Sequence, residues 1–371
     1  MIGEKKQGNG LFVIAIILLS FSNVFAISGY AYSIYYTEIA TLLISLAIVI
    51  SLACRINQSF RIIDIVLFSI SALFIIAIAF SFKTIYQVTN VIMLFGITFW
   101  VNLFSKLKWD NDRYALCGLA CSIYSVIMIA LFLPGNVLSG WNPNSSIAII
   151  PVAFFAISCL MMAKNKWKTW AILITIIAVA ILVLQLENRS SFLALVLFAI
   201  VCLFKKIRNS KVGFRAFYIT VISLNILLPF FFEIATSTSL FKAISNVLLD
   251  VFDKNGLNGR ETVWAAAIGR IGERPLFGTL GYRIAYYHNF SLDILIQFGW
   301  IGWLIFISVL VYIFETSYSK NSTSNIFILG FVCLIFLNTF ESVLFCNNYF
   351  MPFAYLLLGM CWNKKSKRLD K

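Results

Sequence analysis

Long apolar runs separated by short polar turns recur along most of this 371-residue chain. A run of about 20 apolar residues crosses the hydrocarbon core of a bilayer as an α-helix, which satisfies its own backbone hydrogen bonds. The mean hydropathy of +0.92 excludes a water-soluble domain, because water does not tolerate so much exposed apolar surface. The sequence therefore predicts an all-α polytopic membrane protein, folded as a single integral-membrane domain over residues 1–371. Twelve transmembrane helices are expected, at 10–27, 38–54, 62–82, 86–105, 114–134, 146–163, 169–186, 190–204, 216–233, 291–314, 323–341 and 343–362.

The charges test this topology, since lysine and arginine accumulate on cytoplasmic segments of membrane proteins. With the N-terminus inside, 21 of the 29 basic residues fall on the cytoplasmic side. We therefore expect both termini in the cytoplasm. The net charge of +14 follows from this orientation and from attraction to anionic lipid headgroups, so it does not indicate nucleic-acid binding. The eight cysteines lie in apolar runs, which is typical of small buried hydrophobic residues and not of a metal site.

One segment departs from the charge pattern, namely the long outer loop at 234–290 between the ninth and tenth predicted spans. It carries six basic residues against the general bias, and an anionic ligand on that face would explain them. Its second half also holds four arginines and leads to His288, the only histidine in the chain. The arginines are Arg260, Arg270, Arg274 and Arg283.

Local patterns divide this loop into parts. The stretch 239–252 has an apolar stripe that predicts a helix lying along the membrane surface. From Arg260 to Gly272 apolar residues, including Trp264, recur at helical spacing, and Pro275 ends the helix. The following glycines predict a flexible segment, which leads to His288 and Asn289 at the mouth of the tenth span.

Two other outer turns carry candidate site residues, and each has two interpretations. Arg189 precedes a span that begins with Ser190 and Ser191. It either extends its guanidinium to the headgroup level or, together with free N–H groups of the helix start, forms a cradle for phosphate oxygens. The turn around 141–144 either supplies turn and capping residues or lines a sugar-binding cleft through Trp141, Asn142 and Asn144.

Four short motifs, taken in order, resemble a known family. They are NRSSFLAL from Asn188, GRETVW from Gly259, PLFGTLG from Pro275 and HNFSLDILIQFGWIG from His288, preceded by an asparagine-rich WNPNS turn. This pattern resembles the core of the O-antigen polymerase and O-antigen ligase family of bacterial inner-membrane glycosyltransferases, over residues 140–305. Asn188 stands where serine or threonine is commoner. Asn289 is followed by Phe290 where ligases often have glutamate, which favours a polymerase.

The resemblance implies a GT-C-like membrane glycosyltransferase that works without a metal or cofactor, with a glycan on undecaprenyl pyrophosphate as donor and a second glycan as acceptor. Arg189 and Arg260 match the two arginines of the family and would neutralise the leaving pyrophosphate. His288 would take the proton of the attacking sugar hydroxyl. Further candidate substrate-binding residues are Arg270, Arg274, Arg283, Trp264, Asn289, Trp141, Asn142 and Asn144.

Three functions remain in competition. The first is a surface-polysaccharide polymerase that joins lipid-linked repeat units in the bacterial inner membrane, with a flippase and a chain-length regulator as expected partners. The second is a ligase that transfers the finished polymer to lipid A core. The third is a lipid-linked oligosaccharide flippase, but transporters usually show two similar halves and ionisable groups at mid-membrane depth. Neither feature is evident in this sequence.

Overall fold

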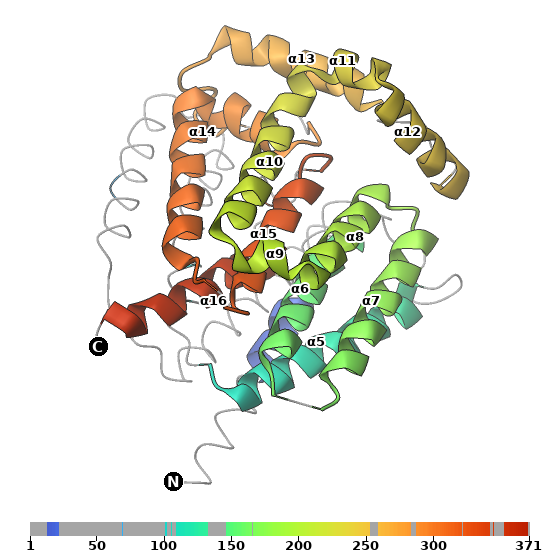
Figure 1. Cartoon of the computed structure of the whole chain (residues 1–371). Helices are drawn as coiled ribbons and strands as arrows, with labels where there is room; N and C mark the ends of the chain where they lie inside the picture. Colours follow the sequence, from blue (N-terminus) through green and yellow to red (C-terminus); the bar gives the residue numbers. More distant parts are fainter. Residues whose placement is uncertain are drawn as a thin grey trace.

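The computed structural model describes residues 13–21, 109–132, 146–164, 166–252, 259–282, 287–320, 322–341 and 352–369, with isolated positions at 69, 101, 105 and 344. All regular secondary structure in these residues is helical, and Figure 1 shows its arrangement. The helices are α5 (Asn111–Phe132), α6 (Ser146–Met162), α7 (Lys168–Gln185), α8 (Arg189–Leu203), α9 (Lys205–Asn209), α10 (Lys211–Phe230), α11 (Phe232–Ser237), α12 (Ser239–Phe252), α13 (Arg260–Glu273), α14 (Phe290–Ser317), α15 (Asn325–Leu337) and α16 (Pro352–Leu369).

The expected all-α membrane architecture is confirmed at this coarse level. The helices α5, α7, α10 and α14 are long and apolar enough to cross a membrane, and α6, α8 and α15 are shorter apolar helices. These seven helices coincide with the predicted spans between 114 and 341. The spans predicted at 38–54, 62–82 and 86–105 lie almost entirely outside the described residues. The total of twelve spans therefore stays a prediction.

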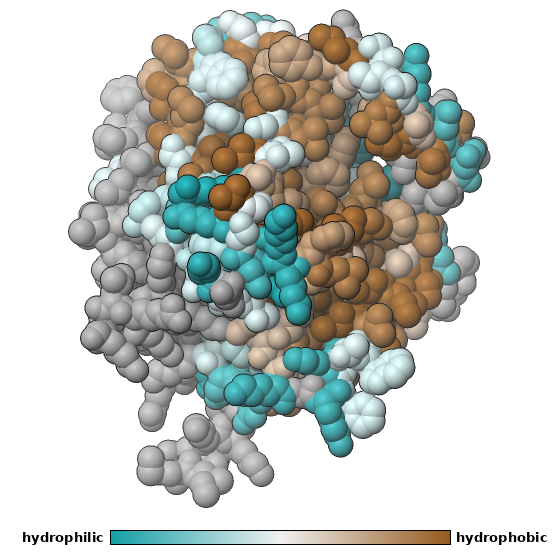
Figure 2. Space-filling view, in the orientation of Figure 1, coloured by the Kyte–Doolittle hydropathy of each residue, from teal (hydrophilic) through white to brown (hydrophobic). Residues whose placement is uncertain are grey.

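The core of the bundle is built around α15. This helix is apolar on all sides, and α6, α8, α10 and α16 pack around it. A helix that is hydrophobic all round must be covered all round. By contrast, α7 exposes a row of aliphatic side chains, among them Leu173, Ile174, Ile177 and Ile181. Figure 2 shows the apolar surface that α7 and α8 contribute, and in a membrane protein lipid covers such a surface.

Two of the predicted cytoplasmic segments, 205–215 and the turn around Lys320, meet at one end of the bundle. The side chain of Asn325, the first residue of α15, donates to the backbone oxygen of Arg208 in α9 (2.8 Å). Nearby helix ends are joined by an ion pair of 2.6 Å between Arg215 of α10 and Glu315 of α14. Among the described residues, 234–252 and 259–274, predicted on the outer side, lie at the opposite end of α10 (Figure 1). Which end faces the cytoplasm stays a prediction.

Buried amides tie the other end together. Asn225 of α10 donates to the backbone oxygen of Ile335 (3.1 Å) and accepts from the backbone N–H of Ser291 (3.2 Å). Asn289 donates to the backbone oxygens of Asn225 (2.9 Å) and Thr339 (3.0 Å). Inside a membrane, burial of apolar surface favours contacts between helices no more than contacts with lipid, so side-chain hydrogen bonds of this kind help to hold helices together. They fix the position of α14 relative to α10 and α15.

The tenth predicted span is not a continuous helix, and the segment expected to be flexible is docked into its break. Gly299 interrupts α14 with φ 64° and ψ −171°. A break inside a span frees backbone groups that lipid cannot satisfy, and residues 275–281 supply their partners. Trp300 N donates to Pro275 O (2.8 Å), Ile301 N to Leu276 O (3.2 Å), Thr279 N to Ile296 O (2.9 Å) and Gly281 N to Gln297 O (2.8 Å).

The long loop itself is largely helical. The helix predicted from 260 to 272 is observed as α13, and the amphipathic stretch 239–252 is observed as α12. Figure 1 shows α11, α12 and α13 together at one end of the bundle, with α12 extending away from it past α8 and α7. Leu240, Ile244 and Val247 of α12 are exposed, so the protein itself leaves much of the apolar stripe of this helix uncovered.

Candidate functional site

His288 lies in a short extended connection directly before α14, and its neighbours fix its position. Trp264 of α13 is fully buried and donates from its indole N–H to the backbone oxygen of Tyr287 (3.1 Å). Asn289 is also fully buried, and its side-chain oxygen accepts from the N–H of Leu292 (3.0 Å), which caps α14. His288 itself has φ 52°. Trp264 and Asn289, predicted as substrate-binding residues, thus hold the chain in place on either side of His288.

Arg260 begins α13 and reaches the connection after α15. Its Nη2 lies 2.7 Å from Oε1 of Glu341, and its Nε donates to the backbone oxygen of Phe340 (2.9 Å). The Arg260 side chain is 16% exposed and the Glu341 side chain only 5%. A charged pair removed from water in this way needs good geometry and further hydrogen bonds to be tolerated. The second bond, to Phe340, meets that requirement for the guanidinium.

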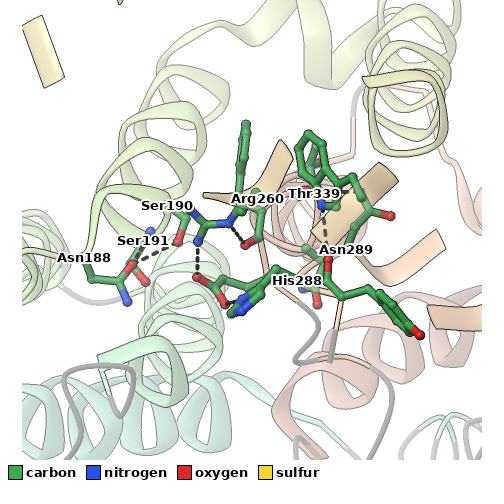
Figure 3. A network of polar contacts seen from close by, with 12 residues as sticks. Asn188, Ser190, Ser191, Arg260, His288, Asn289 and Thr339 are labelled. Atoms are coloured by element: carbon green, nitrogen blue, oxygen red, sulfur yellow. Dashed lines mark hydrogen bonds and ion pairs between the residues drawn. The ribbon is translucent and has the colours of Figure 1, made fainter. Parts of the chain in front are cut away.

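The same carboxylate contacts His288. Oε2 of Glu341 lies 3.2 Å from Nδ1 of the imidazole, whose side chain is 33% exposed. One buried carboxylate therefore bridges a guanidinium and an imidazole, each through a different oxygen. Figure 3 shows the three groups together with the start of α8. The imidazole is the most exposed member of this chain of contacts.

Arg189 stands at the start of α8, where the structure corrects one detail of the expected phosphate cradle. The helix start does not have all its N–H groups free, because Asn188 accepts from the N–H of Ser191 (3.0 Å) and the hydroxyl of Ser190 (2.9 Å). Arg189 is 9% exposed. Burial, followed by the positive charge of Arg260, lowers the pKa of the Arg189 guanidinium. The two arginines predicted to share an anionic ligand therefore lie within electrostatic reach of one another.

Like charges that approach in a partly buried site repel, and an anion between them relieves the repulsion. Glu341 supplies one negative charge next to Arg260. Guanidinium groups suit phosphate oxygens because their planar array of N–H donors matches the oxygen positions.

Two further predicted residues, Arg270 and Arg274, do not join this cluster. Arg270 and Arg274 are exposed near the end of α13. They lie on the same end of the molecule as the site. Four other predicted residues fall outside the described part of the chain, namely Arg283, Trp141, Asn142 and Asn144.

Glu341 is the site residue that sequence reasoning missed. It ends the eleventh predicted span, and a lone carboxylate beside an apolar run was available as a signal. Ionisable residues within or at the ends of spans are costly and mark functional positions. The sequence nevertheless gave no indication that this carboxylate faces an imidazole 53 residues away in the chain.

Comparisons with protein-family models, with curated proteins and with solved structures give no match. The fold and the site define a helical protein with membrane-crossing helices and a cationic cluster with one histidine at one end of its bundle.

Proposed function

We propose that this protein is a membrane glycosyltransferase that polymerises a surface polysaccharide, O-antigen or capsule, from repeat units linked to undecaprenyl pyrophosphate. The observation that carries the proposal is the convergence of Arg189, Arg260 and His288. These residues come from three separate segments and meet at one end of a bundle whose helices can cross a membrane. They are also the residues that the family resemblance selects.

The reaction uses each group in a defined way. A hydroxyl oxygen of the acceptor glycan attacks the anomeric carbon of the donor, and the bond from that carbon to the pyrophosphate oxygen breaks. Undecaprenyl pyrophosphate leaves with the bonding electron pair, and Arg189 and Arg260 neutralise the charge that develops on it. His288 accepts the proton of the attacking hydroxyl.

The proposed setting is the bacterial inner membrane, with about twelve spans by the length rule for apolar helices, both termini in the cytoplasm and the 234–290 loop on the outer face. The separation of the two groups of polar segments to opposite ends of the bundle supports this orientation. A lipid-linked donor would then present its pyrophosphate at the headgroup level, where the arginines lie. A flippase and a chain-length regulator are the proposed partners.

Complementation tests this function. Arg189→Ala, Arg260→Ala and His288→Ala are expressed in a strain that lacks its own copy, and membrane insertion is verified for each. We expect the ladder of surface polysaccharide to disappear in all three variants, because removal of one charge-stabilising donor costs about 10²- to 10³-fold in rate. Arg215→Ala, at the opposite end of the bundle, is the matched control and should keep the ladder. A full ladder with His288→Ala and Arg260→Ala would refute the proposal.

The alternative functions leave different products. A ligase defect leaves free lipid-linked polymer, whereas a polymerase defect leaves single repeat units on the final acceptor. The Asn289-Phe290 pair, where ligases often have glutamate after asparagine, favours the polymerase. A flippase would not transfer glycan between lipid carriers at all. Transfer by the purified protein in detergent, without a membrane gradient, therefore separates an enzyme from a carrier.

A further inference from the structure

We propose that Glu341 is a positioning residue that holds His288 with its proton on Nδ1, so that Nε2 is the nitrogen that accepts the proton of the attacking hydroxyl. The inference rests on the proposed glycosyl transfer for its purpose. Its structural content, the tautomer of the single histidine, can be tested without any activity.

The contact between the two side chains fixes the tautomer. An ionised carboxylate only accepts hydrogen bonds. Oε2 of Glu341 lies 3.2 Å from Nδ1 of His288, so the hydrogen between them belongs to Nδ1. A neutral imidazole carries one N–H, which leaves Nε2 with its lone pair. The nitrogen farther from Glu341 is therefore the basic one.

Arg260 completes the arrangement by orienting the carboxylate. Its Nη2 binds Oε1 at 2.7 Å, which turns Oε2 towards the imidazole. The guanidinium also places an opposite charge in contact with this carboxylate. Among the described residues, Glu341 contacts the imidazole, Arg260 contacts Glu341, and the charge of Arg189 lies within reach of Arg260.

The carboxylate of Glu341 also stabilises the imidazole after the hydroxyl proton has moved to it. When Nε2 takes the hydroxyl proton, the imidazole becomes a cation in the same cluster as Arg260, whose charge by itself would oppose it. Glu341 supplies the compensating negative charge in contact with the ring. A carboxylate that fixes the tautomer and stabilises the imidazolium acts through the histidine, as the aspartate does in a Ser-His-Asp triad.

A purely architectural ion pair is the alternative, in which Glu341 only connects α13 to the segment before α14. The two roles differ in what Glu341→Gln does. Glutamine has nearly the same shape, and its oxygen can still accept from Arg260. Its amide N–H then faces Nδ1 of His288 as a donor, which makes Nδ1 an acceptor and moves the ring proton to Nε2.

Nitrogen NMR on the protein labelled with ¹⁵N-histidine shows directly which ring nitrogen of His288 carries the proton. The chain has one histidine, so a protein purified through a histidine-free tag gives the signals of one imidazole. At a pH where the ring is neutral, we expect Nδ1 protonated and Nε2 unprotonated in the wild type. We expect the reverse in Glu341→Gln, and no change in the control Glu315→Gln. A wild-type ring protonated on Nε2, or a ring unchanged by Glu341→Gln, would overturn the proposal.

Transfer kinetics give the functional half of the test. With a lipid-linked repeat unit as substrate, Glu341→Gln should lower kcat by about 10²- to 10⁴-fold, the usual contribution of a general base. KM for the donor should change little, since Arg260 keeps its partner. Should the NMR result hold while the wild type transfers no glycan, the proposed function fails and the tautomer assignment stands. An unchanged kcat in Glu341→Gln, with an active wild type, overturns the positioning role.

Discussion

Replacing Gly299 by alanine should detach the segment 275–281 from α14. A Cβ atom at Gly299 would lie 2.1 Å from the backbone oxygen of Leu276 and 2.5 Å from the N of Phe277. These are backbone atoms of the docked segment, so no side-chain rotation can relieve the contact. The backbone angles of Gly299, φ 64° and ψ −171°, also belong to a region that is essentially reserved for glycine.

The size of the expected change in the free energy of unfolding follows from backbone strain and from lost hydrogen bonds. Holding alanine in that conformation costs about 1–3 kcal/mol. Expelling the segment removes the four backbone hydrogen bonds described above, each of which contributes a net ~1 kcal/mol. If α14 became a regular helix instead, alanine would recover about 1 kcal/mol relative to glycine, and Trp300 N and Ile301 N would pair with the oxygens of Ile296 and Gln297, four residues earlier. Either outcome costs stability, and we expect a loss of about 1–3 kcal/mol in the free energy of unfolding.

Two measurements check this. Equilibrium unfolding in mixed detergent micelles gives the change in free energy, and hydrogen exchange of the peptide 275–282 reports whether the amides of Thr279 and Gly281 have lost protection. Gly269→Ala in α13 is the matched control, because a Cβ there meets no atom within 4 Å. That variant should be unchanged or more stable by up to about 1 kcal/mol.

Activity should fall together with stability, since the segment leads directly to Tyr287 and His288. The reasoning is refuted if Gly299→Ala unfolds like the wild type and keeps 275–281 protected. In that case the backbone hydrogen bonds between the segment and α14 do not hold the segment in place.

Two further outcomes are expected. Asn289→Ala should lower the free energy of unfolding by about 1–3 kcal/mol, because it removes a buried cap and leaves buried carbonyl groups without their donor. Asn289→Asp, which can cap but cannot donate, should lower it as well. An unchanged unfolding curve for both variants would contradict the assigned network. A photoreactive benzophenone side chain placed at Val247 of α12 should crosslink to lipid in reconstituted vesicles, because this exposed residue lies on the apolar stripe. The same group at Asn246, on the polar side of the helix, should not crosslink to lipid. Equal crosslinking at both positions would rule out an interfacial helix.

Local sequence determined the helices of this protein. The run 260–273 and the stretch 239–252 formed helices as predicted, because apolar residues at helical spacing and a following proline act over a few residues. The membrane-crossing helices followed from apolar length alone, since a bilayer permits few other structures. The sequence also singled out His288, as the one histidine of the chain, and Arg189 and Arg260, through the family resemblance; their roles stay predictions.

Tertiary structure decided what those residues contact. Glu341 lies 81 positions from Arg260 and 53 from His288, and no local pattern links residues so far apart. The break at Gly299 was hidden because its strain is relieved only by backbone groups of residues 275–281, whose docking is a matter of packing. The burial of Trp264 and Asn289 was not predictable for the same reason, since burial depends on which helices come together. Apolar periodicity acts within a segment, whereas an ion pair or a docked backbone depends on two segments meeting, and only the folded chain brings them together.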